Sequence, residues 1–342
     1  MRCFSWLTLG LCLLLALPGS SRAWNATGHM VVARLAWSQL TPAQRQKAHE
    51  LLKKHPHYAS YLQAEKPAGV DEGEWAFLRS SIWADWIRPP KNFPPADLPT
   101  HAQHKFHRGP WHYVSVPYKP GDPVPASLPA TLASPTDVLE QMAVAIDILK
   151  GTTTTDAGRA AQVSNEQNRA VRLCWLAHQV GDLHQPLHAI SLVDAARFPD
   201  GNHDDQGGNR LAIRPDIGAE PTKLHTFWDA LLGTDAHHDT VSAIAQSLAS
   251  DPRFAASELT ELTAHPSIQE WALESHVHAI ESAYLKGTLP VATWDDFAAG
   301  RITTTEVPVL GNGIERDARR LAQRRVVLAG HRLAKLVAES LP

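Results

Sequence analysis

The histidine and aspartate residues of this chain include pairs with the spacing of metal ligands. His178 and Asp182 are four residues apart, and so are His225 and Asp229. Residues four apart on a helix share one face, so each pair can bind a single ion. A buried histidine–aspartate hydrogen bond is the alternative for either pair taken alone. Two pairs of the same kind favour metal binding.

Three further candidates lie outside those pairs. His188 follows Pro186, which breaks the helix and lets the histidine turn toward a second ion. Asp85 ends the run Ser-Ile-Trp-Ala-Asp, which has the character of buried sequence, and His112 stands alone. Imidazole nitrogen with carboxylate oxygen, without thiolate, is the ligand set of catalytic rather than structural zinc. The set therefore predicts a multi-zinc hydrolase.

The first 23 residues have the features of a signal peptide. Arg2 precedes an apolar run over residues 7–17, and Ser21 and Ala23 are small residues at the positions that a signal peptidase inspects. We expect cleavage after Ala23, which leaves one domain over residues 24–342 in a secreted or periplasmic protein. The apolar run is too short to span a bilayer and no second long run follows, so no membrane association is expected.

Cleavage after residue 23 would place the free α-amino group of Trp24 five residues before His29. Cys3 and Cys12 would leave with the signal peptide, so Cys174 would be the single remaining cysteine. No internal disulfide is then possible. The core, and metal, must hold the mature fold together.

The charge of the mature chain argues against tight binding of duplex DNA. Removal of Arg2 and Arg22 from the 32 basic residues leaves 30 against 35 acidic residues, a formal charge of −5. Binding to duplex phosphates requires clustered lysine and arginine. Three divalent ions would instead bring a positive charge to one pocket. Substrate attraction is therefore expected to be local.

The pattern along the chain predicts helices and almost no strands. Thr41 and Pro42 begin a helix that covers residues 44–54, and Ser134 and Pro135 repeat this signal before an apolar stripe that ends at Gly151. Further helices are expected at about 165–182, 224–232, 269–286 and 316–340. Segments rich in Pro, Gly or Asp predict long surface loops at 89–110, 119–133 and 192–223. No linker separates two cores, which favours a single all-α domain.

These residues resemble the zinc-dependent single-strand nucleases and 3′-nucleotidases of fungi, plants and bacteria, typified by fungal nuclease P-one. The resemblance covers nearly all of the chain after residue 23 and rests on six motifs: Trp24-Asn-Ala-Thr-Gly-His29, Trp83-Ala-Asp85-Trp-Ile-Arg88, Trp111-His112-Tyr113, residues 178–188, Gly207-Gly208-Asn209, and residues 225–229. It also reaches Gly330-His-Arg-Leu-Ala334 in the last predicted helix. The resemblance implies one globular domain of many helices around a trinuclear zinc cleft.

The resemblance also implies the ligands of three zinc ions. They are Asp85, His112 and His178 for the first; the amino nitrogen and carbonyl oxygen of Trp24 with His29 for the second; Asp182 as a bridge between these two; and His188, His225 and Asp229 for a third, more exposed ion. Five of the 19 histidines are used, which leaves 14. We expect these others in loops or at the surface, including His101, His104, His107, His184 and His203.

Such a cluster predicts phosphoester hydrolysis. A water shared by two zinc ions is acidic enough to be hydroxide near neutral pH and can attack phosphorus in line, while the third zinc takes charge on the leaving 3′ oxygen. Asp85 would also orient this nucleophile. The resemblance implies that Arg88 contacts the phosphate and that Asn209 supports the same pocket. A surface salt bridge is the alternative for Arg88.

The expected substrates are single-stranded DNA and RNA, cut to 5′-mononucleotides, and 3′-nucleotides. Tyr113 matches the aromatic residue that stacks on an unpaired base; core packing is the alternative. Ser115 stands where fungal relatives carry an aspartate, so their base preference is not implied. The main alternative function is that of a zinc-dependent phospholipase C. The last metal ligand of that enzyme is a glutamate, whereas this chain has Asp229. A non-catalytic metal-binding protein would need neither Arg88 nor Asn209. We expect a monomer without a stable protein partner.

Overall fold

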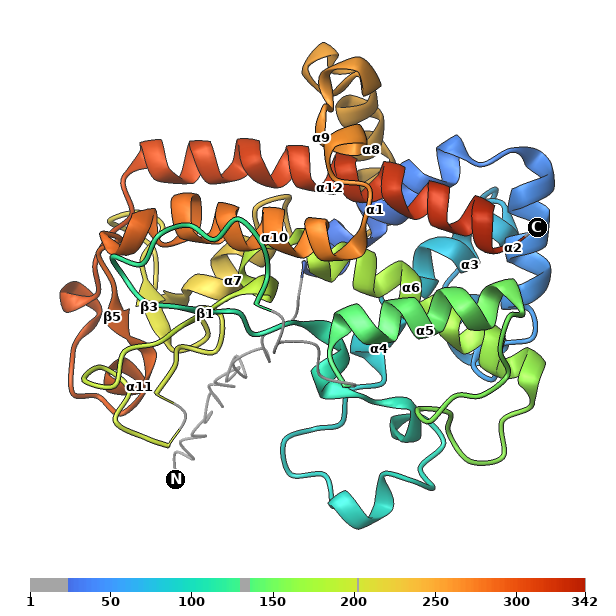
Figure 1. Ribbon diagram of the computed structural model, residues 1–342, viewed down its shortest axis with the longest axis horizontal. Helices are drawn as coiled ribbons and strands as arrows, with labels where there is room; N and C mark the ends of the chain where they lie inside the picture. Colours follow the sequence, from blue (N-terminus) through green and yellow to red (C-terminus); the bar gives the residue numbers. More distant parts are fainter. Residues whose placement is uncertain (1–23, 130–135, 202, 342) are drawn as a thin grey trace, which may run out of the picture.

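The computed structural model describes residues 24–129, 136–201 and 203–341, so the predicted signal peptide, residues 1–23, lies outside the described residues. The fold is all-α, as predicted (Figure 1). Its α-helices are α1 (Ala26–Gln39), α2 (Pro42–Leu52), α3 (Glu72–Ser80), α4 (Trp83–Trp86), α5 (Val138–Lys150), α6 (Asn165–His184), α7 (Leu224–Asp229), α8 (His238–Ser250), α9 (Glu261–Ala264), α10 (Ile268–His278), α11 (Trp294–Ala298) and α12 (Asn312–Ser340).

The strands are short and lie at one end of the helices (Figure 1). They are β1 (Pro117–Tyr118), β2 (Ser191–Leu192), β3 (Leu211–Ile213), β4 (Thr222–Lys223) and β5 (Ala292–Thr293). β1 and β2 form a parallel pair, and the other three form an antiparallel sheet in the order β4-β3-β5. Within the described residues, no helix has the length and apolarity needed to cross a bilayer.

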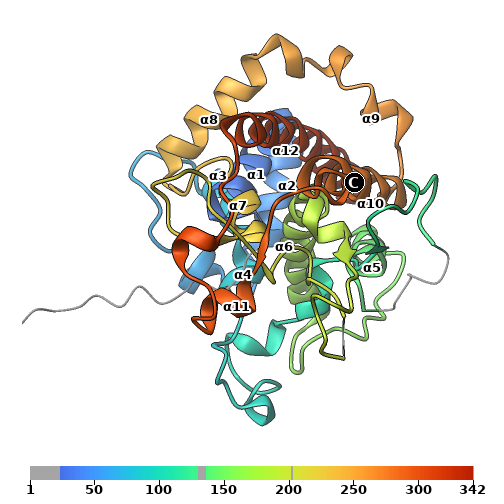
Figure 2. The same cartoon turned by 90° about the vertical axis from the view of Figure 1, so that its left-hand side faces the viewer.

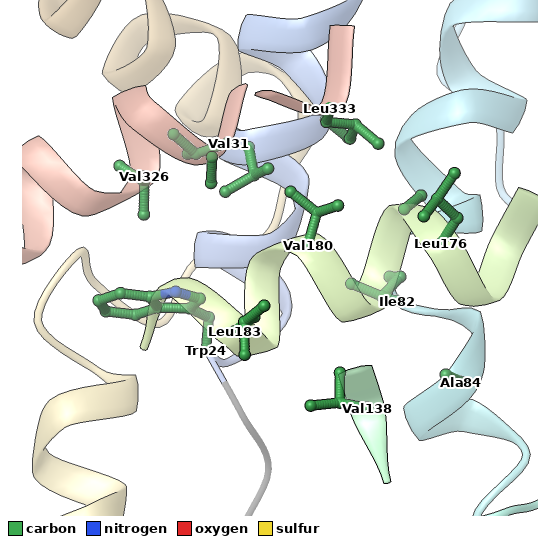
Figure 3. Packing of buried hydrophobic residues seen from close by; sticks show 14 of the residues in the cluster. Trp24, Val31, Ile82, Ala84, Val138, Leu176, Val180, Leu183, Val326 and Leu333 are labelled. Carbon is green, nitrogen blue, oxygen red and sulfur yellow. The ribbon is translucent and has the colours of Figure 1, made fainter. Parts of the chain in front are cut away.

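Helix α6 occupies the centre of the fold. It contacts α1, α2, α3, α4, α5, α10 and α12, and every residue from Ala170 to His184 is buried. Figure 3 shows Leu176, Val180 and Leu183 of α6 packed among apolar side chains of its neighbours. Because a helix buried on all sides has no solvent-facing stripe, each polar residue in this stretch needs a partner in the interior.

Helix α12 crosses α1 at a close approach, which the end-on view of Figure 2 also shows. A Cβ atom at Gly330 would lie 2.6 Å from the Cβ of Leu35. Glycine at this position lets the two backbones meet. The contact fixes α1, and α1 in turn carries one of the predicted metal ligands.

Most of the predicted helix boundaries are confirmed. α2 begins with a capping box at Thr41, and α5 ends at Gly151, which has a φ of 74°. The predicted start of α5 is wrong: the carboxylate of Asp137 accepts hydrogen bonds from two backbone N–H groups of the first turn. Ser134 and Pro135 lie outside the described residues.

Six helices and one buried strand differ from expectation. The sequence pattern did not predict α1, α3, α4, α8, α9 or α11. Helix α1 is buried on nearly every side, so it lacks the polar face that marks an amphipathic helix. The predicted surface loop over residues 192–223 contains β3, whose three residues are all buried. Part of this segment is therefore core.

Candidate metal centre

Five buried side chains from four parts of the fold meet beside α6. We call them the inner group: His29 on α1, Asp85 on α4, His112 at the end of the 3₁₀-helix η4 (Gly109–His112), and His178 and Asp182 on α6. Ligand atoms of His29, Asp85 and His178 lie within 4.8 Å of one another, as do those of His112, His178 and Asp182. Because the two sets share His178, they form one continuous cluster.

The carboxylate of Asp182 faces different histidines with its two oxygens. Its Oδ1 lies 3.2 Å from Nε2 of His29. Its Oδ2 lies 3.0 Å from Nδ1 of His112 and 3.2 Å from Nε2 of His178. A carboxylate placed between two sets of imidazole nitrogens has the arrangement of a bridging ligand.

The position of His29 depends on a glycine in α6. A Cβ atom at Gly181 would lie 2.5 Å from Nδ1 of His29, so a side chain there would displace the imidazole. Without one, the His29 ring stacks on His178 with centroids 4.1 Å apart. Gly181 therefore brings α1 close enough for His29 to reach Asp182. This residue was not singled out from the sequence, although it immediately precedes a predicted ligand.

The outer group consists of His188, His225 and Asp229, whose ligand atoms also lie within 4.8 Å of one another. His188 lies on the 3₁₀-helix η6 (Pro186–Ala189), because α6 ends at His184 before the proline. His225 and Asp229 lie one turn apart on α7, as their spacing predicted.

Backbone carbonyl groups fix the tautomers of the outer histidines. Nδ1 of His188 donates to the carbonyl of His112, and Nδ1 of His225 donates to that of Gly207, both at 2.6 Å. The lone pair of each ring is therefore on Nε2. These two Nε2 atoms face each other at 3.1 Å. Two lone pairs so placed repel unless a cation or proton lies between them.

The inner group also fits a bound cation. Both ring nitrogens of His29, Nε2 of His112 and Oδ1 of Asp182 are buried without a hydrogen bond among the described residues, although Nε2 of His29 and Oδ1 of Asp182 lie 3.2 Å apart. Leaving a buried polar group unpaired costs about 1–3 kcal/mol. Nitrogen and carboxylate donors without thiolate suit catalytic zinc.

The pKa values of Asp182, His112 and His225 agree with ligand roles, whereas burial raises the pKa of Asp229 well above its usual range and, against the effect of burial, the charge of Asp182 raises that of His178. Burial alone would raise the pKa of Asp182, but the charges of His178 and His188 and a hydrogen bond from His112 lower it well below its usual range. Burial lowers the pKa of His112 to about 4 and that of His225 to about 3. At neutral pH the carboxylate is ionised and these two imidazoles are neutral, which are the states that a metal requires.

Gln185 connects the end of α6 to the outer group. Its side-chain N–H donates to Oδ1 of Asp229 at 2.8 Å, and its side-chain oxygen accepts from the backbone N–H of Leu187 at 2.6 Å. One glutamine thus orients the Asp229 carboxylate and shapes the turn that carries His188. No pattern in the sequence had singled out this residue.

Asp205 organises the loop behind the outer group. Its buried carboxylate accepts four hydrogen bonds: from the hydroxyl of Tyr284 at 2.6 Å and from the backbone N–H groups of Leu192, Gly207 and Gly208 at 2.8, 3.1 and 2.8 Å. Burial raises the pKa of Asp205 to about 6, and these hydrogen bonds oppose the rise. The carboxylate therefore holds the carbonyl of Gly207 in place to accept from His225.

A pocket of about 380 Å³, which we call the Tyr113 pocket, opens beside the outer group. Tyr113, Ser115 and Asn209 all line it, together with His188 and His225. The Tyr113 side chain is 45% exposed, which rules out core packing as its role. Oδ1 of Asn209 is buried and has no hydrogen-bond partner in the described part of the chain. An aromatic face is thus available to a ligand, next to a buried amide oxygen that lacks a partner.

Arg88 connects the inner group to solvent. Its guanidinium donates to Oδ1 of Asp85 at 3.0 Å. The Asp85 side chain is 5% exposed and that of Arg88 is 25% exposed, so the pair is not a simple surface salt bridge. Arg88 also lines a pocket at the edge of the cluster.

Trp24 is fully buried at the start of the described chain, with its ring near Leu183 of α6 (Figure 3). The next residue, Asn25, donates its backbone N–H to the carbonyl of Asp229 at 3.2 Å. This contact ties the first residues to the helix that carries the outer group. The role of the Trp24 amino nitrogen as a ligand stays a prediction.

The expectation for the other histidines is partly wrong. His184 is fully buried on α6, where its Nε2 accepts from Arg332 of α12 at 2.8 Å, and His104 is also buried. The contact explains the arginine of the Gly330-His-Arg motif. His107 borders a pocket next to Arg88. Buried histidines without a metal role carry no spacing signal, so the sequence could not distinguish them.

Comparison with known proteins identifies the family of this chain. Endonuclease 4 of Arabidopsis thaliana is 28% identical over 160 residues, a match that spans 43% of this chain and 48% of that protein. The family description S1/P1 Nuclease matches residues 24–342, which include every residue of the inner and outer groups. With a match over nearly its whole length, the chain belongs to the S1/P1 nuclease family.

Proposed function

We propose that this protein is a zinc-dependent phosphodiesterase that cuts single-stranded DNA and RNA to 5′-mononucleotides and also hydrolyses 3′-nucleotides. The observation that carries the proposal is the position of Asp182 between two sets of inner imidazoles, next to a pocket with an exposed tyrosine. Residues 1–23 would act as a signal peptide that exports the domain. Family membership supports nuclease chemistry.

The inner and outer groups, together with the amino end of Trp24, would hold three zinc ions. Bound zinc would supply a Lewis acid and a water of lowered pKa for attack on phosphorus. In this assignment Asp85 orients the attacking group, since Arg88 holds its carboxylate at 3.0 Å. Arg88 would bind the phosphate with its accessible edge, and Asn209 would contact it from the other pocket wall.

Preference for single strands would come from Tyr113. Its ring is exposed within a concave pocket, and stacking on it requires a base that is unpaired and turned out of the helix. Ser115 lines the same pocket. Its hydroxyl group can donate a hydrogen bond to a base or accept one from it, so it suits any base. We therefore expect weak base selectivity.

The test uses zinc-loaded protein and four substrates: a single-stranded oligonucleotide, a closed duplex with capped ends that cannot fray, a 3′-nucleotide and phosphatidylcholine. We expect cleavage of the single strand to 5′-mononucleotides, release of phosphate from the 3′-nucleotide, and little reaction with the other two. Equal rates on the capped duplex would contradict the role of Tyr113. Faster hydrolysis of phosphatidylcholine than of both nucleotide substrates would contradict the proposed function.

A further inference from the structure

The outer group lies between two pockets. The Tyr113 pocket is on one side, and a second pocket of about 320 Å³, which we call the His107 pocket, is on the other. Tyr113, Asn209 and both outer histidines line the two pockets in common. A phosphate bound at this border therefore has room for a substituent in each direction.

The His107 pocket has its own distinct wall. Arg88, His107, Gly109, Pro110 and the inner-group residue His112 line it and do not line the Tyr113 pocket. A Cβ atom at Gly109 would lie 3.7 Å from Nε2 of His107, so the imidazole lies against this glycine. The wall combines one cation, the imidazoles of His107 and His112 and a flat Gly-Pro surface, which are groups that suit a phosphate and an attached planar ring.

The segment that carries His107 is anchored to the body of the protein. Nδ1 of His104 donates to the carbonyl of Ile87 at 2.9 Å, and the side chain of Gln103 donates to the carbonyl of Trp86 at 2.5 Å. On the other side, the Arg108 guanidinium donates to the carbonyl of Gly158 at 2.9 Å. The sequence predicted a long surface loop here, but these bonds make it a fixed wall of the pocket.

The His107 imidazole is suited to contact a neutral part of a ligand. Burial, together with the charges of His112 and Arg88, lowers its pKa to about 4, so it is uncharged at neutral pH. Its side chain lines the pocket, and its Nδ1 is buried with no hydrogen-bond partner among the residues that the structure describes. A neutral imidazole can stack on a base through its ring face. Arg88 supplies the positive charge that a phosphate requires.

We propose that the His107 pocket is a second nucleotide subsite, which holds the nucleotide on the 5′-phosphate side of the cleaved bond. The Tyr113 pocket would hold the nucleoside that leaves with its 3′ oxygen. This assignment rests on the proposed function. It makes His107 a substrate-contacting residue for dinucleotides and longer strands, but not for a 3′-mononucleotide, which has no second nucleoside beyond its phosphate.

The test compares His107→Ala with His331→Ala, which removes a half-buried histidine of α12 that lines neither pocket. We expect His107→Ala to lower kcat/KM for a dinucleoside monophosphate about tenfold, mostly through KM, since one base contact is lost. Hydrolysis of a 3′-mononucleotide should be unchanged. His331→Ala should leave both substrates unaffected. Zinc content and circular dichroism establish that each variant is folded and loaded.

Equilibrium binding gives a second readout. With the zinc-loaded protein, His107→Ala should weaken the binding of deoxyadenosine 5′-monophosphate about tenfold in calorimetry and leave that of deoxyadenosine unchanged. Equal losses on the dinucleotide and the 3′-mononucleotide, or unchanged binding of the 5′-nucleotide, would overturn the subsite. If the wild type hydrolyses neither substrate, the proposed function fails, and the binding experiment alone then decides on the subsite.

Discussion

Different parts of the fold position the side chains of the inner and outer groups. Three of the predicted inner ligands lie on the long helices α1 and α6, and one short helix and one 3₁₀ turn supply the others. The predicted outer ligands lie on the 3₁₀-helix η6 and the six-residue helix α7. The loop that Asp205 organises lies next to them. Helix packing therefore positions the inner group, whereas hydrogen bonds of loops and turns position the outer group.

The two carboxylates differ in the same way. Asp182 lies within 3.2 Å of three imidazoles, on both of its oxygens. Asp229 lies 3.7 Å from one imidazole, and its other oxygen accepts from the Gln185 amide. Loss of the first carboxylate should therefore disturb two metal positions, whereas loss of the second should disturb one. The number of zinc ions lost from each variant measures this difference.

The largest effect is expected from an extension of the amino end of Trp24. An added, retained Met converts the α-amine to an amide, which offers zinc no lone pair. The extended protein should fold, bind less zinc and be nearly inactive. The matched control is the same protein with a protease site that releases Trp24 as the first residue, which should restore zinc and activity. A full zinc complement and normal cleavage in the extended form would remove Trp24 from the ligand set.

A smaller effect is expected from Asp205→Asn, which tests whether hydrogen bonds of the loop position the outer group. An amide would replace one acceptor oxygen with N–H donors that face the N–H groups of the loop, so the free energy of unfolding should fall by about 1–3 kcal/mol. The outer zinc should bind more weakly, while the inner ions are retained. Urea denaturation and zinc titration against a chromophoric chelator measure both.

The neighbouring aspartate provides the control for that change. Asp204 is partly exposed and its Oδ1 accepts from the backbone N–H of Gln206 at 3.2 Å. Asp204→Asn should therefore change the free energy of unfolding by less than about 0.5 kcal/mol. If both variants are equally stable and bind zinc as the wild type does, the loop does not position the outer group.

The inner group shows how much of the site can be predicted from sequence. His178 and Asp182 are paired by the helix repeat, and this local rule holds because α6 is regular over 20 residues. The end of that helix before Pro186 was also predictable, since proline cannot continue it. The family resemblance then placed His29, Asp85 and His112, which spacing alone does not connect.

The parts that were missed depend on contacts between distant segments. Gly181 matters only because α1 packs against it, and the role of Asp205 depends in part on a hydrogen bond from Tyr284, which lies 79 positions away in the chain. His184 was expected in a loop or at the surface but is buried against Arg332. No local pattern encodes such contacts. The same holds for α1, whose burial on nearly all sides removes the helical stripe.

The zinc content of two matched variants tests whether Asp182 bridges two metal ions. Elemental analysis of the wild type, Asp182→Asn and Asp229→Asn gives the number of ions per chain. We predict three for the wild type, loss of both inner ions from Asp182→Asn, and loss of the outer ion alone from Asp229→Asn. Full zinc content in Asp182→Asn together with loss of most zinc from Asp229→Asn would contradict the assignment of Asp182 as the bridge.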